Sequence, residues 1–157
     1  MKFQTFDQVV DYAIDREISA RLFYLHLAHV STDPDLCQLL ESFADQELQH
    51  QKKLARVKQG HFKMLDGDMP VLDLGIADRA PDVEPYPDMS LSEGLVLAMN
   101  KEKQAYRMYL QLAEKVDNSE LKAIFMGLAN EEANHKVRVE IEFDDHLMNS
   151  DQPDNEA

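Results

Sequence analysis

Apolar residues recur at spacings of three and four along four stretches of the chain, which is the period of an amphipathic helix. The first two stretches cover about residues 6–30 and 34–58, and the last two cover about residues 91–116 and 120–147. Between the two pairs, residues 60–89 lose this period and contain most of the glycines and prolines. We therefore predict an all-α chain of four helices.

The predicted helix starts carry residues that satisfy free backbone N–H groups. Thr5 and Ser90 are each followed three residues later by Gln or Glu, which is the spacing of a capping box. Asp33 precedes Pro34, and an aspartate before a first-turn proline predicts the start of the second helix. The fourth helix follows a short polar turn, and Ser119 is its expected cap.

The lengths of the connections predict how the helices pack. Short turns after the first and third helices make two antiparallel hairpins. Residues 60–89 are long enough to cross the bundle, because a helix of about 25 residues is about 37 Å long. One long crossover is the ferritin-like bundle topology, in contrast to an up-down-up-down bundle. We predict one ferritin-like four-helix domain over residues 1–148 and an acidic, disordered tail over residues 149–157.

Six polar residues repeat between the two predicted hairpins at a constant offset of 85 positions. Within each hairpin a glutamate is followed 30 positions later by a Glu-x-x-His motif, and flanking apolar positions repeat with the same offset. A repeat of two copies favours a closed pair of hairpins over a solenoid. The six residues are Glu17, Glu47 and His50 in the first half and Glu102, Glu132 and His135 in the second.

These six residues are candidate metal ligands. Each lies on the apolar stripe of its helix, and the four glutamates lie 12 to 14 positions from their helix starts, so they meet at one height in the core. A buried, unpaired carboxylate costs several kcal/mol, and two divalent cations match four carboxylates in charge. A Glu from two helices and a Glu-x-x-His motif from the other two is the di-iron or di-manganese arrangement of bundle proteins.

We predict two iron ions per chain, bridged by Glu47 and Glu132, with Glu17 and Glu102 as terminal ligands and one histidine on each metal. Oxygen and imidazole ligands with open positions suit iron or manganese, and zinc can occupy such a site in a preparation. A single Glu-x-x-His motif is common on solvated helix faces, but two copies with matched partners argue against coincidence.

Three tyrosines are candidates for a role around the metals. Tyr24 and Tyr109 follow the first glutamate of each hairpin by two turns on the same stripe, and Tyr106 lies nearby. They can donate hydrogen bonds near the metals or pass electrons, or they can pack in the core with a satisfied hydroxyl, which we favour. Cys37, near the start of the second helix, is expected to be a small buried hydrophobic residue.

Composition narrows the functional classes. A chain of 157 residues with 44% apolar residues suits one compact domain, and a lone cysteine forms no internal disulfide. The net charge of −14 disfavours nucleic acids and anionic membranes as partners. The N-terminus lacks the apolar core of a signal peptide, and no apolar run reaches the ~20 residues of a membrane span. We therefore expect a soluble, cytoplasmic protein.

The chain resembles the rubrerythrin branch of the ferritin-like superfamily over about residues 5–147. The segment Glu17-x-x-Ala20-x-x-Phe23-Tyr24 and the two Glu-x-x-His motifs carry the resemblance. It implies a non-haem di-iron protein that reduces hydrogen peroxide, usually as a homodimer. It also implies relatives that store iron or activate dioxygen.

Two features depart from the rubrerythrin pattern. No cysteine pairs follow residue 147, so a rubredoxin domain is missing and we expect electrons from an external donor such as a rubredoxin-like protein. Rubrerythrins carry an extra glutamate one turn after the third-helix ligand, where this chain has Ala105. The remaining set of four glutamates and two histidines is closer to bacterioferritin-type centres and counts against efficient peroxidase activity.

Our leading hypothesis is a di-iron oxidoreductase that reacts with hydrogen peroxide or dioxygen in oxidative-stress defence. The main alternative is a ferroxidase or iron-handling protein of the ferritin or bacterioferritin type. Oxygenase chemistry on an organic substrate is a third hypothesis and requires a pocket beside the metals. A metal-free scaffolding bundle is a fourth, and it predicts that a chelator leaves the melting temperature unchanged.

Overall fold

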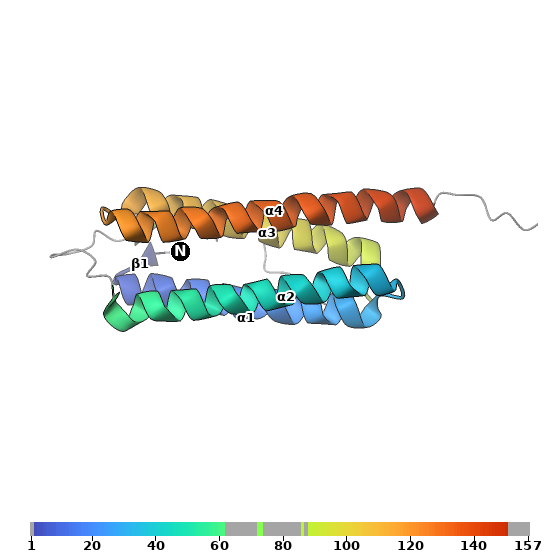
Figure 1. Ribbon diagram of the computed structural model, residues 1–157, viewed down its shortest axis with the longest axis horizontal. Helices are drawn as coiled ribbons and strands as arrows, with labels where there is room; N and C mark the ends of the chain where they lie inside the picture. The colour runs from blue at the N-terminus through green and yellow to red at the C-terminus, as the bar shows by residue number, and fades with distance from the viewer. Residues whose placement is uncertain (1, 62–71, 74–85, 87, 151–157) are drawn as a thin grey trace, which may run out of the picture.

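Four long helices form an elongated bundle in the computed structural model, which describes residues 2–61, 72–73, 86 and 88–150 (Figure 1). They are α1 (Phe6–Val30), α2 (Pro34–Arg56), α3 (Leu91–Lys115) and α4 (Ser119–Ser150). A short π-helical turn, η1 (Val57–His61), follows α2, and the two-residue strands β1 (Lys2–Phe3) and β2 (Leu72–Asp73) pair with each other. The predicted four-helix bundle is confirmed.

The helices lie in two layers, with α1 and α2 in one and α3 and α4 in the other (Figure 1). Each layer is an antiparallel hairpin, and between the layers α1 contacts α3 and α2 contacts α4. The end of α2 and the start of α3 lie at opposite ends of the bundle, so the two helix ends that the connection joins are separated by its whole length (Figure 1). This is the ferritin-like topology. Most of the predicted crossover, residues 60–89, lies outside the described residues.

The helix starts follow the predicted capping residues in three of four cases. The Thr5 hydroxyl accepts a hydrogen bond from the Gln8 N–H at 3.2 Å, and the Asp33 side chain caps α2, with Pro34 in its first turn. Ser90 and Glu93 form both hydrogen bonds of a capping box at α3. Such caps stabilise a helix by about 1 kcal/mol each.

The cap of α4 differs from the prediction. Asn118, not Ser119, supplies it, because the Asn118 Oδ1 atom accepts a hydrogen bond from the Leu121 N–H at 3.0 Å. Ser119 is already the first helical residue. Both residue types are good caps, so the sequence alone did not separate two adjacent candidates.

The ends of α2 and α4 also differ slightly from the prediction. The regular part of α2 ends at Arg56, and η1 then leads to Gly60, whose φ of 83° lies in the left-handed region that favours glycine. The last helix continues to Ser150, past the predicted end at Leu147. The first two residues of the predicted tail are therefore helical, and residues 151–157 lie outside the described part of the chain.

The short β1–β2 pairing was not predicted. Phe3 pairs with Leu72 in antiparallel register, so the N-terminal segment is tied to the long connection. The Phe3 side chain is buried and its ring lies 5.3 Å from that of Tyr12, which anchors the strand to α1. Two residues are too few to show the alternating period of a strand, so periodicity could not predict this pairing.

The apolar core is divided into two clusters with the six predicted ligands between them along the helices. The first cluster uses the beginning of α1 and α4 and the end of α2 and α3, and the second uses the end of α1, the beginning of α2 and α3, and Val139 of α4. Each fully buried large side chain stabilises the fold by ~1.5–3 kcal/mol. Fully buried members include Tyr109, Leu112, Leu121, Phe125 and Leu128 in the first cluster, and Tyr24, Leu27, Leu40, Leu95 and Ala98 in the second. The two clusters fix the height at which the polar residues meet.

None of the described helices is both long enough and apolar enough to cross a membrane.

Candidate metal centre

All six predicted ligands are buried in the middle of the bundle. Each side chain is at most 3% exposed, although none is apolar. Charged side chains are rarely buried to this extent unless they are paired or bind a cation. The structure therefore brings together the six residues that the repeat singled out.

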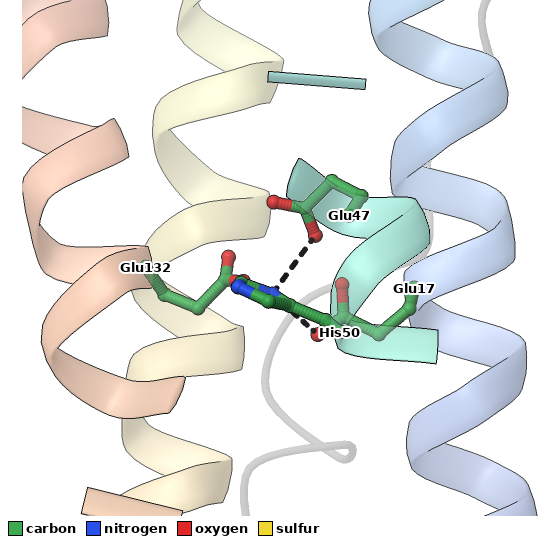
Figure 2. A group of neighbouring side chains, drawn as sticks. All are labelled: Glu17, Glu47, His50 and Glu132. Atoms are coloured by element: carbon green, nitrogen blue, oxygen red, sulfur yellow. Dashed lines mark ion pairs between the residues drawn. The ribbon is translucent and has the colours of Figure 1, made fainter. Parts of the chain in front are cut away.

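The ligand atoms form two groups, and within each group they lie within 4.8 Å of one another. Glu47 and Glu132 belong to both groups, which is the arrangement expected of carboxylates that bridge two metals. Figure 2 shows the first group, in which the His50 ring lies between Glu132 on one side and Glu17 on the other. The first group comprises Glu17, Glu47, His50 and Glu132, and the second comprises Glu47, Glu102, Glu132 and His135.

Both histidines direct their Nδ1 atoms at the carboxylates. The Nδ1 atom of His50 lies 2.6 Å from Oε1 of Glu132, and that of His135 lies 2.9 Å from Oε1 of Glu47. The two rings are stacked, with an interplanar angle of 12° and 6.1 Å between their centres. Each group of carboxylates is thus completed by one imidazole nitrogen.

The opposite nitrogen of each histidine is held by a residue that sequence reasoning missed. The Nε2 atom of His50 hydrogen-bonds the Glu131 carboxylate, and that of His135 hydrogen-bonds the Gln46 side-chain oxygen. Because both partners offer an oxygen acceptor, each Nε2 donates its proton and Nδ1 keeps its lone pair for a metal. Gln46 and Glu131 occupy equivalent positions of the repeat but differ in type, so the repeat of identical residues does not single them out.

Two tyrosines hold the outer glutamates across the layers. The Tyr24 hydroxyl of α1 donates to Glu102 of α3, and the Tyr109 hydroxyl of α3 donates to Glu17 of α1. Burial and the neighbouring carboxylates raise the pKa of both tyrosines well above the ordinary value, so the hydroxyls remain donors. The expected core packing with a satisfied hydroxyl agrees with these contacts.

Tyr106 is not part of this arrangement. It is half-buried and packs against the first apolar cluster, and none of its described hydrogen bonds reaches the six residues. Cys37 also differs from expectation, because it is half-buried rather than buried. Its thiol lies 3.6 Å from the Glu41 carboxylate, since its position near the start of α2 faces the edge of the core.

The close carboxylates change one another's protonation. Burial, followed by the charges of Glu17 and Glu102, raises the pKa of Glu47 well above its usual range. Burial and the charges of the three other glutamates also raise the pKa of Glu132. Burial acts to lower the pKa of His50, but the nearby carboxylates of Glu17 and Glu131 outweigh burial and raise it. Without metal, these groups therefore hold protons more readily than the same groups in water, and a bound cation would displace those protons.

Unsatisfied buried atoms test whether the cluster fits metals. Within the described residues, eight buried side-chain atoms lack a hydrogen-bond partner, and six of them are one atom from each predicted ligand. An unsatisfied buried polar atom costs ~1–3 kcal/mol, and more when it is charged. Oxygen and imidazole donors that converge in this way fit two divalent cations, with iron or manganese preferred by ligand type. The six atoms are Oε2 of Glu17 and Glu102, Oε1 of Glu47 and Glu132, and Nδ1 of His50 and His135.

Comparison with known proteins identifies the family. A family model described as Rubrerythrin matches residues 8–140. The chain belongs to the rubrerythrin family. No curated protein matches it with significance.

Two solved structures share the fold of this rubrerythrin-family chain. A hypothetical protein from Pyrococcus furiosus has a TM-score of 0.75 and 24% identity, with 95% of this chain and 94% of that chain covered. A Thermotoga maritima protein, proposed to be a ferritin-like diiron-carboxylate protein, has a TM-score of 0.70 and 19% identity, with 88% and 93% covered. Both likenesses confirm the ferritin-like fold.

A small cavity adjoins the candidate metal centre of this rubrerythrin-family member. It has a volume of about 40 Å³ and lies beside the carboxylates at the face between α1 and α3. The repeat-related alanines Ala20 and Ala105 line it, together with the repeat-related bases Arg16 and Lys101. A larger side chain at Ala105 would occupy this space, so the departure noted in the sequence has a structural consequence. The volume holds on the order of two or three water-sized molecules.

Proposed function

We propose that this chain is a non-haem di-iron oxidoreductase that reduces hydrogen peroxide or dioxygen with electrons from an external donor. The observation that carries the proposal is the pair of ligand groups that share Glu47 and Glu132. Each of the six residues has one oxygen or nitrogen atom there that lacks a hydrogen-bond partner. Membership of the rubrerythrin family supports iron as the metal.

Each part of the centre has a separate role in the proposal. Glu17 and His50 would hold one metal and Glu102 and His135 would hold the other, while Glu47 and the equivalent glutamate of α4 belong to both ligand groups. When bound, two ferrous ions supply the two electrons that, with two protons, convert hydrogen peroxide to two waters. The protein positions the ligands through the tyrosine and histidine partners and excludes bulk water with the two apolar clusters.

The size of the cavity favours a small oxidant over an organic substrate. Its volume of about 40 Å³ accommodates peroxide or dioxygen. Pockets for drug-sized organic ligands are roughly 300–1,000 Å³. Oxygenase chemistry on a large substrate therefore has less support than reaction with a small oxidant. The bases Arg16 and Lys101 give the cavity a cationic side in an otherwise acidic chain.

The electron donor, assembly and location are part of the same proposal. The sequence contains a single cysteine, so it holds no rubredoxin-type iron site of its own, and a rubredoxin-like protein is the donor we propose. A cytoplasmic homodimer completes the proposal, by resemblance to rubrerythrins. The net charge of −14 argues against nucleic acid as a partner.

The experiment is rapid mixing of the anaerobic Fe(II)-loaded protein with hydrogen peroxide, and separately with dioxygen, followed by the ferric absorption in the near ultraviolet. We expect oxidation much faster than that of free Fe(II) in the same buffer. Addition of reduced rubredoxin should then return the absorption to its starting value. Oxidation no faster than that of free Fe(II) would remove the oxidoreductase proposal.

Ferroxidase activity is the second candidate, because Ala105 leaves the bacterioferritin-like set of four glutamates and two histidines. It predicts that dioxygen oxidises successive additions of Fe(II) and that ferric iron leaves the centre between additions. A single turnover, with iron retained until a reductant is added, favours the oxidoreductase.

A further inference from the structure

The two halves of the metal centre match closely, except at the residues that hold the histidines. The metal ligands and their tyrosine partners are the same residue types in both halves of the repeat. At the equivalent positions 46 and 131, however, the first half has glutamine and the second half has glutamate. One histidine therefore faces a neutral amide and the other faces a carboxylate.

Both contacts cross from one hairpin to the other. Glu131 of α4 reaches Nε2 of His50 on α2, and Gln46 of α2 reaches Nε2 of His135 on α4. His50 is only 1% exposed, so the Glu131 carboxylate acts on a buried imidazole whose Nδ1 atom faces the candidate metal position. Glu131 itself is 46% exposed, so solvent screens part of its charge.

We propose that Glu131 and Gln46 make the two metal positions unequal, so that the position of Glu17 and His50 binds its metal first and more tightly. A carboxylate that accepts the Nε2 proton makes the imidazole a stronger donor at Nδ1 and adds negative charge near the cation. A glutamine amide oxygen also accepts the Nε2 proton, but it strengthens the imidazole as a metal ligand less and adds no charge. The inference rests on the proposed di-metal centre and adds the order in which it fills.

The expected difference in affinity between the two metal positions can be estimated from the effect of losing the hydrogen-bond partner of a histidine ligand. Loss of such an outer partner weakens metal binding by about 10- to 100-fold, and the exposure of Glu131 favours the lower end. We expect the first metal to bind about tenfold more tightly than the second. Glu131 and Gln46 act through the histidines and are positioning residues.

The test is anaerobic titration of the metal-free protein with Co(II), followed by calorimetry and by the visible absorption of the bound ion. Wild type should bind two equivalents in two steps. The variant E131Q should bring the two steps together by weakening the first, and Q46E should bring them together by strengthening the second. Anomalous diffraction from crystals with one equivalent of Co(II) should place the ion beside His50.

The double variant Q46E/E131Q separates this electrostatic role from a merely structural one. It keeps the same residues but exchanges them, so it should restore two steps and move the first ion to the position beside His135. Equal steps in wild type, or a first ion that stays beside His50 in the double variant, would overturn the inference. No binding of Co(II) would also remove the proposed centre, whereas unequal binding without peroxide reactivity would remove only the proposed reaction.

Discussion

Substitution of Glu47 by glutamine should change stability in opposite directions with and without metal. Glu47 is 1% exposed, its Oε1 atom has no hydrogen-bond partner, and it lies among three other buried carboxylates. In the metal-free protein, glutamine removes the ionisable group and keeps the shape. With metal present, the same change removes a ligand that both groups share.

The magnitude follows from the desolvation of one group. The glutamine amide can donate a hydrogen bond to a neighbouring carboxylate oxygen, and satisfying one buried polar atom in this way is worth ~1–3 kcal/mol. In a domain of this size, each kcal/mol changes the melting temperature by about 2–4 °C. Metal-free E47Q should therefore melt about 2–12 °C above metal-free wild type. A metal at 100 times its dissociation constant stabilises wild type by about 2.7 kcal/mol, and E47Q should lose most of that gain.

The assay is thermal unfolding of both proteins, followed by circular dichroism, in chelator and in excess Co(II). Glu41 of the same helix is exposed and lies outside both ligand groups, so E41Q is the matched control and should behave like wild type in both conditions. A lower melting temperature for metal-free E47Q, combined with an undiminished gain on adding metal, would refute the reasoning.

Three further outcomes are expected. Tyr109→Phe should weaken Co(II) binding about tenfold, because Glu17 loses its hydroxyl partner, while Tyr106→Phe should leave binding unchanged in the same titration. Ala105→Leu should fill the cavity and slow oxidation by peroxide in rapid mixing, while two metals still bind; an unchanged rate would exclude this cavity as the route of entry. The pKa of Glu47 and Glu132 is raised in the metal-free fold, so above the ordinary value of 4.5 the folded state binds more protons than the unfolded state. Urea denaturation of the metal-free protein should therefore show stability falling as the pH rises from that value, and constant or rising stability would contradict the assignment.

Helix positions and the burial of the six candidate ligands were predictable because both depend on local periodicity. Helix length and connection length then determined the hairpins and the crossover. Glu17 and Glu102 could be placed in the core because the stripe and the distance from the helix start agreed for each. The rubrerythrin family membership was likewise readable from these positions.

Contacts between the two hairpins were harder to predict. Tyr24 was recognised as a candidate, but its bond to Glu102 depends on how α1 packs against α3, which periodicity within one helix does not contain. Glu131 and Gln46 gave still less signal, because both lie at partly or fully exposed positions and differ between the repeats. The β1–β2 pairing involves only two residues in each strand, and the Asn118 cap involves one hydrogen bond. Neither is large enough to leave a pattern in the sequence.

Metal analysis of the purified chain after anaerobic loading with Fe(II) and removal of unbound ions tests the central claim most directly. The account predicts about two irons per chain for wild type, in keeping with the two ligand groups. The double variant E47Q/E132Q should retain almost none, because it removes both shared ligands. No retained iron in wild type, or equal iron in the folded double variant, would contradict the assignment of this cluster as a di-iron centre.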